Sequence, residues 1–236
     1  MDVLGVLGGM GPLASAEFLK TLYHANLHSR EQDMPRVLVD SDPGFPDRTE
    51  AVAGGPGAQE IGRRLAVRLE DLLARGADRL VMACFTAHHF LPLVDPLIRE
   101  RVTSLVDVAL DELDRADGRF LLLCTEGTRR ARVFQSSPLW DRVAARVALP
   151  GEPDQELVHR MVYRMKRHGA LGDVAPAVDR LRARYGCSGV ILGCTEFHLV
   201  SGGLTGVLGE ANVVDALRAF ARTCTAPYRK DLQHAG

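Results

Sequence analysis

Two cysteines, Cys84 and Cys194, end two similar apolar runs of the chain. The runs are LVMACFTAHH at residues 80–89 and GVILGCTEFH at residues 189–198. A thiolate is both a base and a nucleophile, and the N-terminus of a following helix stabilises it. Two thiols that face one carbon atom can take a proton from one side and return a proton to the other. The sequence therefore predicts general acid–base catalysis by a pair of cysteines.

The same residues allow two other interpretations. Each cysteine is followed four positions later by a histidine, His88 or His198, so the two runs together hold the ligand types of a zinc site. The two pairs are far apart in sequence, however, and a histidine one turn into a helix is more often a capping or core residue. Buried cysteines are also common as small apolar core residues. The matched setting of the two cysteines favours a catalytic role, and we expect no metal ion.

Short apolar runs alternate with longer amphipathic stretches along the whole chain. The predicted strands are residues 3–7, 36–40, 79–83, 120–124 and 189–193. The predicted helices include residues 13–28, 57–75, 105–116, 153–168, 173–185 and 213–223. Strands separated by helices indicate parallel sheets in an α/β fold, and continuous apolar runs are typical of strands covered on both faces.

The chain also resembles itself. Residues 79–84 align with 189–194 at an offset of 110, and residues 5–11 align with 121–127 at an offset of 116. This period is too long for a solenoid and indicates two pseudo-symmetric α/β halves with parallel sheets. Ligands bind outside the carboxyl ends of parallel strands. We therefore expect an active-site cleft between the halves, with one thiol on each wall.

Length and composition limit the class of protein. The 236 residues, 46% hydrophobic and 25% charged, suit a globular protein of one large domain or two small ones. We divide the chain into a first α/β domain, residues 1–100 plus 212–236, and a second, residues 101–211.

A net charge of −1 predicts no binding to nucleic acid or to a membrane. Five cysteines without a disulfide-type spacing, and an N-terminus unlike a signal peptide, predict a cytoplasmic protein.

Three further segments hold groups that bind anions. GVLGGMGPLA (5–14) has a loose glycine fingerprint before a helix, whose free N–H groups suit a carboxylate or phosphate. FPDRTEAV (45–52) contains Arg48, which can bind a carboxylate through two hydrogen bonds or pair with a neighbouring acid. CTEGT (124–128) would present hydroxyl and N–H groups to the same cleft, or a threonine there would cap a helix.

Five motifs in order resemble the aspartate/glutamate racemase family, and within it the aspartate racemase branch. They are GVLGGMGPLAS (5–15), PDRT (46–49), ACFTAHH (83–89), EGT (126–128) and LGCTEFHL (192–199), and they span nearly the whole chain. The resemblance implies a two-domain pseudo-symmetric α/β fold. It also implies that two cysteines racemise an acidic amino acid without a cofactor, in a homodimer that takes a small carboxylate substrate.

The resemblance assigns roles to individual residues. Cys84 and Cys194 match the catalytic pair, and Arg48 and Thr49 match residues that hold substrate carboxylates. The other substrate-binding residues that it implies are Met10, Phe85, Thr86, Thr128, Lys166, Thr195 and Glu196.

Phe85 departs from the family pattern, which has asparagine after the first cysteine. The amide would donate to the substrate's α-carboxylate, and its loss would weaken binding by about 1.5–3 kcal/mol. This leaves two alternatives beside a racemase of an acidic or modified amino acid. One is a related isomerase or decarboxylase of a maleate- or malonate-like acid, in which one cysteine attacks covalently. The other is a catalytically silent ligand-binding protein.

Overall fold

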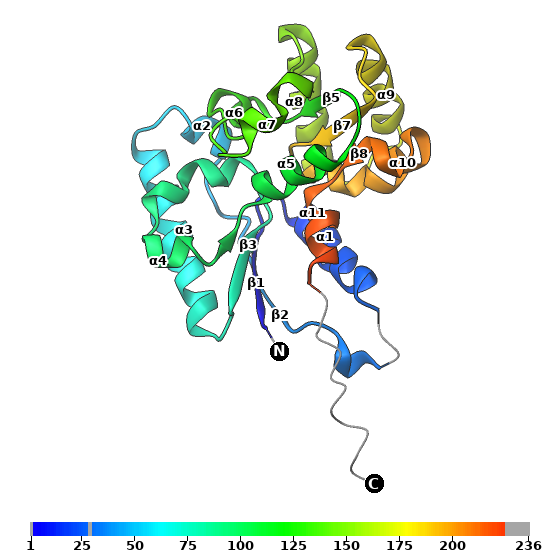
Figure 1. Cartoon of the computed structure of the whole chain (residues 1–236). Coiled ribbons are helices and arrows are strands. Elements are labelled where there is room, and N and C mark those ends of the chain that lie inside the picture. Colours follow the sequence, from blue (N-terminus) through cyan, green and yellow to red (C-terminus); the bar gives the residue numbers. More distant parts are fainter. Residues whose placement is uncertain (1, 28–29, 225–236) are drawn as a thin grey trace.

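The computed structural model describes residues 2–27 and 30–224, which form two four-stranded parallel sheets covered by helices (Figure 1). The first sheet has the order β2-β1-β3-β4 and the second the order β6-β5-β7-β8. The strands are β1 (Leu4–Gly8), β2 (Val37–Ser41), β3 (Arg79–Met82), β4 (Val102–Thr103), β5 (Phe120–Leu123), β6 (Val147–Ala148), β7 (Gly189–Leu192) and β8 (Val213–Val214). The predicted class, two similar α/β halves with parallel sheets, is confirmed.

The two sheets are equivalent strand by strand. In the first, β3 pairs with β1 from Arg79 opposite Leu4, and in the second, β7 pairs with β5 from Gly189 opposite Phe120. These are the segments that align in the sequence at offsets of 110 and 116. All residues of β1, β5 and β7 are buried, because helices cover both faces of each sheet.

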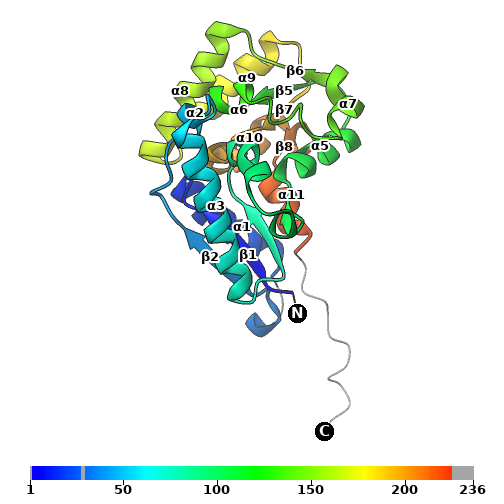
Figure 2. The same ribbon diagram turned by 90° about the vertical axis from the view of Figure 1, so that its left-hand side faces the viewer.

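Helices pack on both faces of the sheets, as the two views at right angles show (Figures 1 and 2). The longer helices are α1 (Pro12–Ala25), α3 (Pro56–Ala74), α5 (Leu105–Arg115), α8 (Glu152–His168), α9 (Val174–Arg184), α10 (Ser201–Leu208) and α11 (Ala216–Arg222). The short ones are α2 (Arg48–Ala51), α4 (Pro96–Arg99), α6 (Glu126–Arg130) and α7 (Trp140–Val143). The 3-10 turns are η1 (Glu31–Asp33), η2 (Thr86–Leu93), η3 (Ala144–Arg146), η4 (Thr195–Val200) and η5 (Glu210–Asn212). In the described residues, no helix is long and apolar enough to cross a membrane.

The predicted domain boundaries do not agree with the sheets to which two short strands belong. β4 pairs with β3 in the first sheet, although the predicted division gave residues after 100 to the second domain. β8 pairs with β7 in the second sheet, although residues from 212 onward were given to the first. The predicted helix 213–223 begins later, at Ala216, because the Asp215 carboxylate accepts the N–H groups of the first helical turn. Residues 1, 28, 29 and 225–236 of the predicted ranges lie outside the described residues.

One hydrophobic core joins the two halves. It contains Val6 of β1 and Phe120 of β5, together with buried residues of α1, α5 and α11. The helices α1 and α11 lie side by side, and the ring centroids of Phe18 and Phe220 on them are 6.1 Å apart. Two further cores lie under α3 in the first half and under α8 and α9 in the second. The central core holds the carboxyl ends of the two sheets against each other.

Candidate active site

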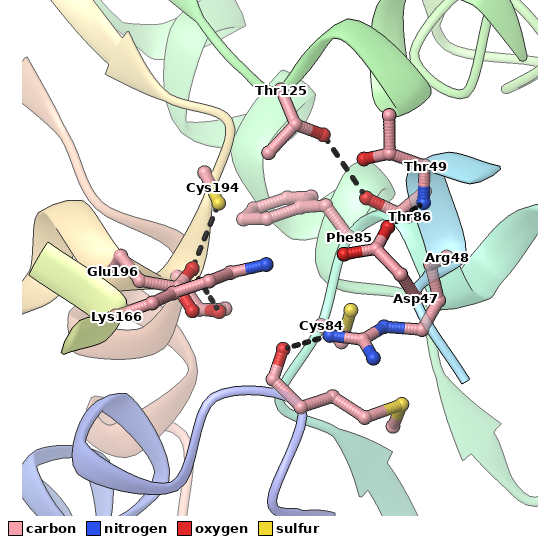
Figure 3. A pocket seen from close by; sticks show the side chains of 12 residues that line it. Asp47, Arg48, Thr49, Cys84, Phe85, Thr86, Thr125, Lys166, Cys194 and Glu196 are labelled. Atoms are coloured by element: carbon pink, nitrogen blue, oxygen red, sulfur yellow. Dashed lines mark hydrogen bonds between the residues drawn. The ribbon is translucent and has the colours of Figure 1, made fainter. Parts of the chain in front are cut away.

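A small cavity lies between the halves, beyond the carboxyl ends of the central strands (Figure 3). Both halves contribute to its lining: Met10, Asp47, Arg48, Thr49, Cys84, Phe85, Thr86, Thr125, Lys166, Cys194, Thr195 and Glu196. The volume open to the centre of a water molecule is about 10 Å³, which is room for about one water. The cavity is therefore narrow, and it must widen to admit a ligand of amino-acid size.

The two cysteines reach this cavity from equivalent strands. β3 ends at Met82 and β7 ends at Leu192, in each case two residues before the cysteine. Cys84 is 5% exposed and Cys194 is 7% exposed. Figure 3 shows the two sulfur atoms on different sides of the pocket. The structure thus brings both predicted catalytic residues to one cavity, although they are far apart in the chain.

Cys194 has an acidic partner. Its Sγ donates a hydrogen bond to Oε2 of Glu196 at 2.8 Å, and Glu196 is only 2% exposed. Burial raises the pKa of the Cys194 thiol well above its usual range, the Glu196 carboxylate raises it further, and Lys166 acts in the opposite direction. Cys194 is therefore held as the protonated thiol, which is the form of a general acid.

Cys84 has a cationic neighbour, Arg48. Burial acts to lower the pKa of Arg48, but negative charge at Cys84 and at Asp47 outweighs it and raises that pKa above its usual value. The guanidinium therefore stays charged beside the Cys84 sulfur. The charged neighbour of Cys84 is thus a cation, whereas the hydrogen-bond partner of Cys194 is a carboxylate.

Three backbone carbonyl oxygens accept hydrogen bonds from the Arg48 guanidinium. Its Nη1 donates to the carbonyls of Phe45 and Pro46 at 3.4 and 2.8 Å, and its Nη2 donates to the carbonyl of Met10 at 2.9 Å. These bonds fix the loop before α1 against α2. The buried Nε–H of Arg48 has no hydrogen-bond partner among the described residues.

Lys166 of α8 supplies a second cation, and it belongs to a group that also contains Tyr163 and Asp47. The Lys166 Nζ lies 4.4 Å from the ring centroid of Tyr163. Burial acts to lower the pKa of Lys166, but Glu196 and Cys194 outweigh it, so the pKa is raised and the ammonium stays charged. The Tyr163 hydroxyl donates to Oδ2 of Asp47 at 2.6 Å and so joins the two halves.

Phe85 has two roles in the fold. It lines the cavity next to Cys84, and its ring stacks on Phe134 in the central core, with centroids 5.3 Å apart and planes inclined by 23°. The cavity wall is therefore apolar at the position where the family pattern has an amide.

Three threonines of the two halves share hydrogen bonds at the cavity wall. The Oγ1 of Thr86 lies 2.8 Å from that of Thr128 and 3.3 Å from that of Thr125. Thr128 was predicted to bind substrate, but Thr125 lines the cavity and Thr128 lies behind it. The reason is local, because Thr125 is the N-cap of α6 and its hydroxyl accepts the N–H of Thr128. Thr125 and Asp47 are thus lining residues absent from the predicted set, and only their places in CTEGT and PDRT hinted at them.

The two histidines of the zinc alternative have other partners. The His88 Nδ1 lies 2.9 Å from the carbonyl oxygen of Cys84, and its Nε2 accepts the N–H of Leu105 at 3.2 Å. Burial lowers the pKa of His88, which keeps the ring neutral. The His198 Nδ1 lies 2.7 Å from Oδ2 of Asp215. Each histidine therefore ties a strand end to the N-terminus of a helix, and no three His, Cys, Asp or Glu among the described residues are grouped to hold a metal.

Fold and site together define a class: two equivalent α/β halves that present one thiol each to a shared, narrow cavity lined by the cationic side chains Arg48 and Lys166. The sequence profile of the Asp/Glu/Hydantoin racemase family matches residues 7–224 of this chain. The chain belongs to this family, and the predicted resemblance is confirmed.

Individual relatives agree with this placement. A glutamate racemase of Pseudomonas paraeruginosa is 31% identical over 179 residues, which are 71% of this chain and 64% of that protein, so the match spans less than two thirds of its length. Picrophilus torridus aspartate racemase has a TM-score of 0.78 at 21% identity, covering 95% of this chain and 93% of that one. A putative Asp/Glu racemase from Yersinia pestis has a TM-score of 0.73 at 20% identity, covering 95% and 97%. These two structures share the fold.

Proposed function

We propose that this protein is a cofactor-independent amino-acid racemase of the aspartate/glutamate type. Cys84 and Cys194 would exchange protons with opposite faces of the α-carbon of an acidic or modified amino acid. What supports this most is the pair of unlike thiols at one cavity, Cys194 bonded to Glu196 and Cys84 beside Arg48. Membership of a racemase family supports an isomerase reaction.

Charge at the cavity suits a dicarboxylate. Arg48 has a free Nε–H and Lys166 has a charged ammonium, so two cationic groups are available to two carboxylates. The hydroxyl groups of Thr49, Thr86 and Thr195 complete the polar lining, and Met10 closes it next to Arg48. The unpaired oxygen of Glu196, described below, is an acceptor in reach of the same cavity and suits the amino group of the substrate.

The reaction is a proton exchange in two directions. A thiolate removes the α-proton, and the opposite thiol delivers its own proton to the other face of the carbon. With the mirror-image substrate the two cysteines exchange roles. Negative charge that develops on the α-carboxylate is stabilised by the neighbouring cations and hydroxyls, more strongly than in water because the side chains around it are mostly buried.

Phe85 favours a second candidate function. Its ring replaces a donor to one carboxylate, so an acid with a different arrangement of carboxylates, maleate- or malonate-like, is the alternative substrate of an isomerase or decarboxylase. A ligand-binding protein without turnover is the remaining alternative.

We also propose that the protein is a cytoplasmic homodimer. The family resemblance supports the homodimer, and the five cysteines, all of them free thiols, support a cytoplasmic location.

Deuterium uptake at the α-carbon in heavy water tests the proposal, with D- and L-aspartate and D- and L-glutamate as the first substrates. We expect exchange in the wild type and its loss in Cys84→Ala and in Cys194→Ala. Cys187→Ala is the matched control, because Cys187 is buried in the core under α8 and α9, away from the cavity lining. Full exchange in the double variant Cys84→Ala, Cys194→Ala would rule out the mechanism. A covalent thiol adduct seen by mass spectrometry with a maleate- or malonate-like acid would support the second candidate instead.

A further inference from the structure

We propose that Glu196 makes the two thiols unequal by holding the proton on Cys194, so that the resting protein presents Cys194 as an acid. Glu196 is then a positioning residue that acts through Cys194. This inference rests on the proposed function, since it says which thiol starts the proton exchange.

The duplicated halves differ at this position. The residue two places after Cys194 is Glu196, and the residue two places after Cys84 is Thr86. The Thr86 hydroxyl bonds to the hydroxyls of Thr125 and Thr128 rather than to the neighbouring thiol. One thiol therefore has a carboxylate within hydrogen-bond distance, and the equivalent thiol has none at the equivalent position.

Burying the Glu196 carboxylate is energetically unfavourable, which indicates that the side chain has a function at this position. Its Oε2 accepts the Cys194 Sγ–H at 2.8 Å and lies 3.5 Å from the Thr195 Oγ1, while its Oε1 is buried without a partner among the described residues. A Cβ atom built on Gly11 would be only 2.3 Å from that Oε1. Because Gly11 has no side chain, it leaves room for this carboxylate at the start of α1. A buried oxygen without a hydrogen-bond partner is energetically unfavourable, and such atoms are usually retained because the protein's function needs them.

Charged groups of several elements face this pair. Lys166 of α8 lies near both Glu196 and Cys194 and acts to lower the pKa of the thiol, and Arg48 also interacts with Glu196. Asp47 bonds to the Tyr163 hydroxyl. His198, on the same turn as Glu196, bonds to Asp215 and to a threonine of α1. The cations moderate the repulsion between a Cys194 thiolate and Glu196, but among the described residues only Glu196 forms a hydrogen bond with the sulfur.

The proton transfer follows from this arrangement. The substrate's C–H bond breaks and its proton joins the Cys84 thiolate, while the S–H bond of Cys194 breaks and its proton forms the new C–H bond. The Cys194 thiolate is then left 2.8 Å from the Glu196 carboxylate, with two negative charges adjacent. Like charges at this distance disfavour the doubly ionised state, so the protein returns to the form with Cys194 protonated.

Thiolate absorbance at 240 nm tests this inference without turnover. The difference between the wild type and Cys194→Ser isolates the titration of Cys194, and the same difference is measured in the Glu196→Gln background. We expect the Cys194 thiolate to form only well above the usual pH range of a thiol in the wild type, and its midpoint to lie at least about one pH unit lower in Glu196→Gln. Lys166→Met should move the midpoint in the opposite direction.

Two further variants make the test specific. Glu156→Gln, on the exposed face of α8, removes a glutamate charge away from the cavity and should leave the Cys194 midpoint unchanged. Glu196→Asp keeps the charge but withdraws it from the sulfur, so its midpoint should lie between those of the wild type and Glu196→Gln. If Glu196→Gln does not fold, the Glu196→Asp midpoint decides.

The outcomes separate this inference from the proposed function. A Cys194 midpoint that is the same in the wild type, Glu196→Gln and Glu196→Asp overturns the inference, whatever the activity. A shifted midpoint in a protein without α-proton exchange upholds the unequal thiols and overturns the racemase. In an active protein, we also expect the alkaline limb of the exchange rate to move to lower pH in Glu196→Gln by the same amount as the thiol midpoint.

Discussion

The rings of Phe85 and Phe134 stack across the boundary between the two halves, with centroids 5.3 Å apart. Phe85 is 3% exposed and Phe134 is 1% exposed, and both belong to the core that contains strands of both sheets. The residue that follows the Cys84 thiol is therefore also part of the contact that holds the halves together. Phe85 therefore belongs both to the contact between the halves and to the cavity wall.

Removing the Phe85 ring should destabilise the whole protein. We expect Phe85→Ala to lower the free energy of unfolding by about 3–5 kcal/mol, because it leaves a cavity in a closed core. A double-mutant cycle with Phe134→Leu should give a coupling of about 0.5–1.5 kcal/mol from the stacked pair. Urea unfolding of the four proteins measures both quantities, and additive effects would contradict a specific interaction between the rings.

Placing an amide after Cys84 should improve the binding of an acidic amino acid. If Phe85 stands where the family pattern has a carboxylate donor, Phe85→Asn should lower KM for aspartate or glutamate about tenfold or more, which matches one charge-assisted hydrogen bond. The same variant should be less stable, since the stack with Phe134 is lost. Phe85→Leu is the control, because it removes the ring without adding a donor. An equal KM in the Asn and Leu variants would show that an amide here does not reach the substrate.

The Asp47–Tyr163 hydrogen bond should stabilise the protein in a pH-dependent way. Burial acts to raise the pKa of Asp47, but the bond from Tyr163, the charge of Lys166 and the N–H groups of Thr49 and Glu50 outweigh it, so that pKa is lowered. A lowered folded-state pKa contributes stability that is complete above the unfolded pKa and is lost as the pH falls through the folded value.

Tyr163→Phe should therefore lower the free energy of unfolding by about 1 kcal/mol at pH 7, a small value because the Asp47–Tyr163 pair is half exposed. This loss of stability should shrink as the pH falls below about 4. Thermal or urea unfolding at several pH values measures it. Tyr23→Phe is the matched control, since the Tyr23 hydroxyl makes no hydrogen bond within the described part of the chain. A loss that is constant down to pH 3 would show that the ionised Asp47 is not the partner that matters.

Gly11→Ala should reduce activity far more than stability explains. The backbone at Gly11 has a φ of −119°, which alanine adopts without strain, but its methyl group would meet Glu196 Oε1 at 2.3 Å. The carboxylate must move, and with it the bond to Cys194, so we expect at least about a tenfold loss of α-proton exchange. Gly206→Ala in α10 meets no atom within 4 Å and should be neutral or slightly stabilising, by about 0.4–1 kcal/mol. Equal activities of the two variants would contradict a role for the Gly11–Glu196 contact.

The strands that carry the cysteines could be predicted because β3 and β7 are continuous apolar runs in a chain that repeats itself. The long helices were predictable for the same reason, since α3 and α8 each follow a clear amphipathic pattern. The strands β4, β6 and β8 have two residues each, too few to show a period. Their absence from the predicted set also explains the displaced domain boundaries.

The motifs placed most of the predicted site residues on one cavity, but could not show what those residues touch. Thr125 and Thr128 stand in the same short motif, and only the capping of α6 decides that the first lines the cavity. The stacking of Phe85 on Phe134 joins segments with no common pattern in the sequence. The Cys194–Glu196 bond depends on the turn η4, whose backbone directs both side chains to the same side. Contacts of this kind follow from packing rather than from residue type and spacing.

The central core has a consequence for how the chain folds. A duplicated architecture suggests two independently stable units, but here α11, from the end of the described chain, packs against α1 at its beginning and α5 in its middle. Part of the apolar surface of each half is therefore buried only against the other half. We therefore expect heat or denaturant to melt the two halves in a single cooperative transition, and neither half expressed separately to be a stable fragment.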